Sequence, residues 1–176
     1  MLITANKCLP AVGRAVGLAL VLTGGLLATP AWADCNDSPM PKVEWVRCIH
    51  DGRDFHGANL AGAELRDASF FRAKLGGADF SGADAYRAKF YLADLSAARF
   101  DKARIAEADF TEADLRGASL RNADLRGAKL VSADLRNADL TGANLRAADL
   151  FRAELTGATW TDGKRRCAAG SIGQCN

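Results

Sequence analysis

Residues 108–135 read ADFTEADLRGASLRNADLRGAKLVSADL, and within this stretch a large apolar residue returns at every fifth position. The same phase holds from Phe55 to Trp160, where Ala85 is the one position of 22 without a large apolar side chain. Alanine stands two residues earlier throughout, with Arg53 as the exception, and Asp or Asn often lies between the two. A fixed period sustained over this length predicts a repeat architecture.

The five-residue period excludes an α-helix, although alanine, leucine and arginine all favour one. Each step of five rotates a helix by about 140°, so the apolar residues would spread around its whole circumference. Residues two apart share one face of an extended segment, and the remaining step of three then needs a corner. Glycine suits such a corner, and it recurs two positions after the apolar residue at Gly57, Gly62, Gly77, Gly82, Gly117, Gly127, Gly142 and Gly157.

Residues 1–33 are predicted to be a secretory signal peptide. Lys7 and Arg14 supply a positive start, the stretch from Ala15 to Ala28 is apolar, and residues 31–33 read AWA, a small-x-small cleavage site. The alternative is an uncleaved anchor, but the apolar run is short for a membrane span. We therefore expect an exported protein, periplasmic or secreted, with no membrane span in the mature chain. Asp34 before Cys35 does not suit lipoprotein processing.

The charge of the mature chain argues against a nucleic-acid partner. Cleavage after Ala33 removes Lys7 and Arg14 from the 23 cations and none of the 21 anions, so 21 charges of each sign would remain. A chain with no net charge and interspersed signs lacks the basic surface of a nucleic-acid binder.

The remaining cysteines flank the repeats. Cys35 and Cys48 precede them, and Cys167 and Cys175 follow them. Four cysteines in an exported chain predict two disulfides, for which three connectivities are open at this point.

The repeat resembles that of the pentapeptide-repeat family, A-(D/N)-L-x-x, over essentially all of residues 53–162. The resemblance implies an all-β fold, a right-handed quadrilateral β-helix with four pentapeptides per coil and the Ala and Leu/Phe side chains inside. Residues in phase as far back as Val43 extend the solenoid to about six coils. We expect an N-terminal cap with an irregular first coil at 34–52, the solenoid at 53–162 and a C-terminal disulfide cap at 163–176.

This implied fold also pairs the cysteines. At roughly 4.8 Å per coil the rod is about 29 Å long, which is more than a disulfide spans. The resemblance therefore implies the pairs Cys35–Cys48 and Cys167–Cys175, each sealing one end of the rod. It also stacks phenylalanines from coil to coil on two opposite walls, Phe70, Phe90 and Phe110 on one and Phe80 and Phe100 on the other.

Chemistry-bearing groups are sparse, and we expect no enzyme, no catalytic residue, no metal and no cofactor. An alternative is a metal-binding or enzymatic role at Cys48, His50 and His56, which is disfavoured because an exported cysteine with a near partner favours a disulfide. Acidic residues twenty apart are expected to form a solvated ladder neutralised by neighbouring arginines, namely Asp114, Asp134 and Glu154 with Arg116 and Arg136.

A second alternative comes from the resemblance itself. Quinolone-resistance members of the family bind DNA gyrase as DNA mimics through an acidic surface. Export and the zero net charge disfavour this role here, because a duplex-like field needs charges of one sign.

Outward apolar residues gather on one wall of the implied helix, where they would form a stripe along the rod. This predicted interaction surface comprises Phe71, Tyr91, Leu92, Val131 and Phe151. Our leading hypothesis is a non-enzymatic exported solenoid that binds another protein, or itself, through this wall. A passive structural protein of the cell envelope is the alternative. The sequence does not name the partner.

Overall fold

The computed structural model describes residues 35–176, so the predicted signal peptide lies outside the described residues. Within 35–176 the backbone forms no helix and no strand longer than a single bridge residue. Bridge residues instead alternate with two-residue turns every five positions. The extended segments predicted from the sequence are therefore very short, because each wall of the coil is only three residues wide.

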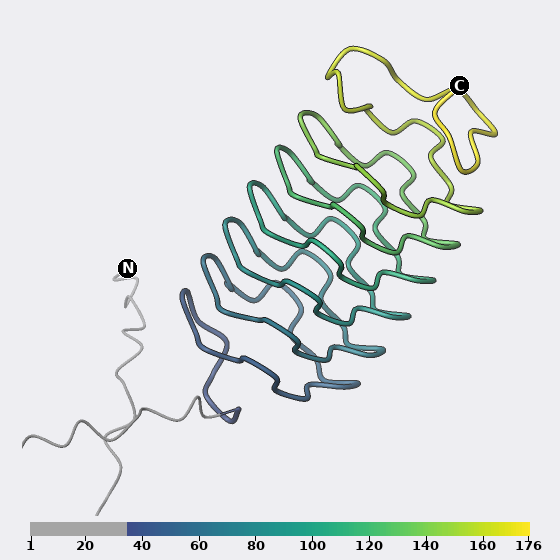
Figure 1. Cartoon of the computed structure of the whole chain (residues 1–176). Coiled ribbons are helices and arrows are strands. Elements are labelled where there is room, and N and C mark those ends of the chain that lie inside the picture. Colours follow the sequence, from purple (N-terminus) through teal and green to yellow (C-terminus); the bar gives the residue numbers. More distant parts are fainter. Residues whose placement is uncertain (1–34) are drawn as a thin grey trace, which may run out of the picture. The chain divides into compact units, whose positions relative to one another are not determined.

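The coils stack through parallel bridges that join residues twenty apart, from Glu44↔Glu64 to Asp139↔Thr159. Each bridge uses the same pair of hydrogen bonds: Leu65 N–H donates to Asp84 O at 2.7 Å, and Asp84 N–H donates to Ala63 O at 2.9 Å. Figure 1 shows the resulting ladder of stacked coils. A spacing of twenty makes four pentapeptides per coil, each with a three-residue wall and a two-residue corner, as the resemblance implied.

We number the walls by their outward bridge residues. Wall 1 carries Glu44, Glu64, Asp84, Arg104, Asp124 and Asn144; wall 2 carries Ile49, Ser69, Lys89, Asp109, Lys129 and Asp149. Wall 3 carries Asp54, Lys74, Asp94, Asp114, Asp134 and Glu154; wall 4 carries Asn59, Asp79, Arg99, Ser119, Asp139 and Thr159.

The preference for Asp or Asn at these outward positions has a local cause. The side-chain oxygen of such a residue accepts the backbone N–H two residues later, which fastens the corner. Asp79 accepts the N–H of Ser81 at 2.9 Å, and Asp109 accepts that of Thr111 at 3.0 Å. The acidic residues of the repeat thus serve the backbone first.

The alanines and large apolar residues line the interior, as predicted. The inward alanines from Ala63 to Ala138 and the inward phenylalanines are almost completely buried. Phe90 stacks on Phe70 at 5.2 Å and on Phe110 at 5.0 Å between ring centroids, and Phe80 stacks on Phe100 at 4.7 Å. Rings of the two stacks meet edge to face at about 6 Å. The predicted phenylalanine stacks are confirmed. Ala85, which lies between Phe80 and Phe90 in the sequence, is fully buried.

The first coil is more regular than predicted from the sequence. Parallel bridges already join Glu44, Ile49 and Asp54 to the next coil, so the backbone is not irregular there. The difference is in the core, where His50 takes the place of a Leu or Phe and is fully buried. An aromatic ring fits this position because His50 stacks on Phe70 at 5.4 Å and extends the phenylalanine stack.

The corners require a left-handed backbone at their second residue. The eight corner glycines predicted from the sequence all have φ between 64° and 74°, and non-glycine residues adopt the same conformation elsewhere. A left-handed conformation costs a residue with a Cβ about 1–2 kcal/mol, so each such corner carries some strain.

One corner offers a matched test of this strain. Gly77 and Ala97 occupy the same corner of successive coils with φ of 67° and 54°, and a Cβ added at Gly77 meets no atom within 4 Å. We expect Gly77→Ala to lower the free energy of unfolding by about 1 kcal/mol and Ala97→Gly to raise it by a similar amount. Urea unfolding of both variants measures this, and equal signs for the two changes would contradict it.

Candidate functional site

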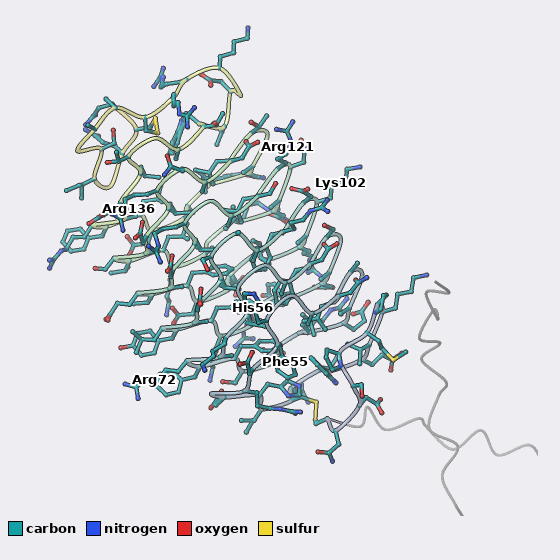
Figure 2. The ribbon with its side chains drawn as sticks, turned by 180° about the vertical axis from the view of Figure 1, so that it is seen from behind. Phe55, His56, Arg72, Lys102, Arg121 and Arg136 are labelled. Carbon is teal, nitrogen blue, oxygen red and sulfur yellow. A yellow bond between two sulfur atoms is a disulfide. The ribbon has the colours of Figure 1, made fainter. Side chains whose placement is uncertain are left out.

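The predicted interaction residues lie on the corner between walls 2 and 3. Phe71, Tyr91, Val131 and Phe151 occupy the first corner position of successive coils, with Thr111 between Tyr91 and Val131, and Leu92 follows Tyr91. We call Phe71, Tyr91, Leu92, Val131 and Phe151 the aromatic corner. In Figure 2 the labelled Arg72 of this corner and the labelled Lys102 and Arg121 lie on opposite sides of the rod.

The end of the corner near the N-terminal coil is an ordered cluster. The rings of Phe71 and Tyr91 stack with their centroids 5.6 Å apart, and the guanidinium of Arg72 lies 4.9 Å from the Phe71 centroid. The Tyr91 hydroxyl reaches Glu112 at 3.5 Å. Stacking leaves Phe71 and Tyr91 half-buried rather than freely exposed, and Leu92 beside them is half-buried as well. The cluster is therefore preorganised, which lowers the entropy cost of a contact.

Leu92 stands out among the corner residues. Its φ is 57°, and it is the only large apolar side chain among the non-glycine residues of 35–176 with positive φ. The others at such positions are charged, polar or alanine. Strain of this kind tends to be retained where the side chain has a role, and Leu92 enlarges the apolar surface beside Tyr91.

The far end of the corner is open. Phe151 is 66% exposed, while Val131 one coil earlier is half-buried. Exposed large apolar residues also occur away from the predicted surface, at Val46, Ile49 and Ile172. The exposed apolar side chains are thus concentrated toward the two ends of the rod, a distribution that the sequence pattern did not predict.

The alternative metal site is not assembled. The sulfur of Cys48 is bonded to Cys35, the Nδ1 of His50 accepts a hydrogen bond from Arg53 at 3.1 Å, and His56 is exposed with its ring against Gly76. No group of three or more His, Cys, Asp or Glu residues in the described part of the chain is placed to hold a metal ion. Sequence spacing suggested one cluster, but the wall separates the inward His50 from the outward His56.

His50 occupies an unusual environment for an ionisable group. Burial, together with the smaller effect of the neighbouring Arg53, lowers its pKa from 6.5 to about 4, and Asp51 partly opposes the shift. Arg53 donates to Nδ1, so the neutral ring carries its proton on Nε2. Neither Nε2 nor the Nε1 of Trp45 has a hydrogen-bond partner among residues 35–176. The neutral ring acts as a core residue.

The acidic residues are paired with arginines along the rod, as expected for a neutralised ladder. On wall 3 the carboxylate of Asp114 binds Arg116, Arg116 also lies 3.8 Å from Asp134, and Arg136 bridges Asp134 to Glu154 at 3.4 Å. The hydrogen bond from the Arg116 side chain lowers the pKa of Asp114 despite some burial. Exposed pairs of this kind contribute little stability each, but they neutralise the charge of this acidic ladder.

The cysteines lie at bonding distance in the pairs that the rod length implied. The Cα atoms of Cys35 and Cys48 are 5.4 Å apart, and those of Cys167 and Cys175 are 4.8 Å apart. The first pair ties the segment before Met40 to the first coil, and the second closes the segment that folds over the last coil. No helix within the described residues has the length and apolar character to cross a bilayer.

The twenty-residue coil and its inward Ala and Leu/Phe define a pentapeptide-repeat solenoid. The family model described as pentapeptide repeats matches eight copies over residues 54–84, 93–130 and 128–159. The chain belongs to the pentapeptide-repeat family, and membership implies a right-handed quadrilateral β-helix. Proteins of this family are generally non-enzymatic structural or interaction proteins. No curated protein sequence matches the chain.

Several solved structures resemble it. HetL, a pentapeptide repeat protein involved in heterocyst differentiation regulation in the cyanobacterium Nostoc sp. strain PCC 7120, is 33% identical over 69% of this chain and 67% of its own, with a TM-score of 0.44. A pentapeptide repeat protein of the Arabidopsis thaliana thylakoid lumen is 25% identical over 74% and 85%, with a TM-score of 0.31. QnrB1, a plasmid-mediated fluoroquinolone resistance protein, is 22% identical over 66% and 72%, with a TM-score of 0.49.

Proposed function

We propose that this protein is an exported, non-enzymatic solenoid of about six coils that binds a partner protein through the aromatic corner. The observation that carries the proposal is the alignment of its large apolar side chains along one corner of the rod. The other exposed large apolar residues of the described chain, Val46, Ile49 and Ile172, lie near its two ends. Aligned aromatic residues with a neighbouring arginine are the side chains enriched at protein contacts.

The geometry of the corner sets the kind of partner. Four coils separate Phe71 from Phe151, which corresponds to about 19 Å along the rod. A contact of that length needs an elongated apolar surface, such as a strand or the face of a helix. Cations stand beside both ends, Arg72 next to Phe71 and Arg152 next to Phe151, so acidic residues at the ends of the partner's apolar surface would complement them.

Export is part of the proposal. Support comes from the apolar run before Ala33 and from two cysteine pairs at bonding distance, since disulfides persist in oxidising compartments. The gyrase-type DNA mimic receives less support, because Asp114, Asp134 and Glu154 of wall 3 pair with arginines and a duplex-like field needs charges of one sign.

The test compares two corners of the same rod. The bait is the mature protein beginning at Asp34, and it is incubated with envelope proteins of the source organism. Protein recovered from the native envelope is expected to begin at the same residue. We expect Phe71→Ser/Tyr91→Ser to reduce capture of a partner more than about tenfold, because two aromatic anchors each contribute about 2 kcal/mol. The control, Lys102→Ser/Arg121→Ser on the opposite corner, retains capture. Equal capture by all three baits, each shown to be folded by circular dichroism, rejects the proposal.

A further inference from the structure

The segment after the last coil covers only half of the rod's C-terminal end. Two antiparallel bridges, Glu154↔Ile172 and Thr159↔Arg166, attach this cap to walls 3 and 4. Leu155 N–H donates to Ser171 O and Gly173 N–H to Ala153 O, both at 2.9 Å. The yellow C-terminal segment in Figure 1 is this cap. It occupies half of the layer that a further coil would fill.

Walls 1 and 2 end in an open edge. In the preceding coil Leu125 N–H donates to Asn144 O at 3.0 Å and Leu130 N–H to Asp149 O at 2.7 Å. The equivalent N–H groups of Leu145 and Leu150 have no backbone acceptor within residues 35–176. The carbonyl groups of Ala143 and Ala148 have no backbone donor there. Leu145 and Leu150 are also only half-buried, unlike their counterparts one coil earlier.

The cap has an open edge of its own. In an antiparallel bridge of this kind the neighbours of the bridge residue bond to the wall, so its own N–H and carbonyl point the other way. Arg166 and Ile172 are the two bridge residues, and neither makes a backbone hydrogen bond with any described residue. Ile172 is 57% exposed. At its C-terminal end each rod therefore has a cap with unbonded backbone groups over walls 3 and 4, beside an empty half-layer over walls 1 and 2.

We propose that two copies of this chain associate through their C-terminal ends, each cap filling the open half-layer of the other. A twofold axis perpendicular to the rod, through the corner of Phe151, places walls 3 and 4 of one copy over walls 2 and 1 of the other. Viewed along the first rod, the chain of the second copy then runs around the rod in the opposite direction, although both helices keep the same handedness. Because each cap segment runs antiparallel to its own wall, it runs parallel to the wall of the other copy, as every coil-to-coil bridge does.

The free groups then match in kind and spacing. Leu150 N–H faces Ile172 O of the second copy, and Ile172 N–H of that copy faces Ala148 O. Leu145, Ala143 and Arg166 form the equivalent set on wall 1. Each set repeats the pair of bonds that joins Leu65, Asp84 and Ala63 within the rod. Open sheet edges are templates for such pairing, and here both partners are copies of one chain, which gives a closed dimer.

The side chains at the axis support the same arrangement. Phe151 and Ile172 are two of the four large apolar residues that are exposed in the described part of the chain. Phe151 lies at the corner through which the axis passes, and Ile172 lies on the cap segment over the adjoining wall 3. The axis brings the four side chains of two copies together, so association removes their apolar surface from water.

The test uses two matched glutamates on one chain. Sedimentation velocity and light scattering of the mature, oxidised protein over a concentration series measure the dimer. We expect Ile172→Glu to weaken dimerisation at least tenfold, because it places charge in the apolar cluster at the axis. Ile49→Glu, a 72% exposed isoleucine on wall 2 at the opposite end, leaves it unchanged. Intact mass verifies the cap disulfide in both variants.

Hydrogen exchange locates the contact independently of these variants. The amides of Leu145 and Leu150 are expected to slow more than tenfold as the protein concentration rises, whereas those of Leu155 and Trp160, already bound to the cap, stay slow throughout. A monomer at all concentrations overturns the proposal, as does a dimer whose Leu145 and Leu150 amides stay fast. Such a dimer, if broken by Phe71→Ser, would place self-association on the aromatic corner instead.

Discussion

Phe90→Ala is expected to lower the free energy of unfolding by about 4 kcal/mol, the range for removing a buried phenylalanine. Phe90 is completely buried at the centre of the double stack, between Phe70 and Phe110 on its own wall and with Phe80 and Phe100 edge-on across the core. Its loss removes buried area and the contacts of four rings. Each coil has few other large side chains to close the cavity.

Two further variants make the measurement specific. Phe90→Leu installs the residue that fills this position in other coils, and we expect a loss of about 1–2 kcal/mol. Phe151→Ala removes the same side chain from an exposed corner, and we expect a change within about 0.5 kcal/mol. Chemical denaturation of dilute protein, below the concentration of any association, provides all three values. A loss under about 2 kcal/mol for Phe90→Ala would show that neighbouring coils collapse into the space.

The second large effect concerns acid. His50 has a pKa of about 4 in the folded protein against 6.5 when unfolded, because burial and Arg53 disfavour its charged form. Above pH 6.5 both states are neutral and the stability is complete. As the pH falls from 6.5 to about 4 the unfolded state binds the proton first, so the folded state loses up to about 3 kcal/mol.

His50→Leu isolates this contribution. Leucine is the usual residue at this position of the repeat and does not titrate, so the variant should lose little stability between pH 6.5 and 4.5. His56 is exposed and is kept in both proteins as an internal control. The measurement is the urea midpoint at several pH values. Parallel pH profiles for the two proteins in that window would contradict the assignment.

The repeat itself could be predicted from the sequence because its signal is renewed at every coil. Alanine and the large apolar residue specify one short wall, and a single misreading is corrected by the next repeat. The phenylalanine stacks followed from ten-residue spacing on a coil of twenty. The corners were predicted only in part. Glycine marks eight of those between Phe55 and Trp160, but Leu92, Arg72 and others adopt the same left-handed backbone because stacking on both sides holds it in place.

The ends could not be predicted in the same way, since nothing there repeats. His50 was read as a departure from the pattern, yet its ring continues the stack on Phe70. The antiparallel attachment of Arg166 and Ile172 could not be predicted, because these residues lie outside the five-residue period. At the aromatic corner the alignment was predictable from spacing, but the exposure was not: Phe71 and Tyr91 shelter each other, while Phe151 has no aromatic neighbour to cover it.

The twenty-residue bridge spacing has a consequence for how such a chain can change in length. An insertion of twenty residues adds one storey and leaves every later side chain above its former column. An insertion of five keeps all cores filled but turns everything beyond it by a quarter. Phe151 would then leave the corner of Phe71, and the cap would settle on different walls. The rod can therefore lengthen in steps of five residues and still fold, but only steps of twenty residues keep its surfaces aligned.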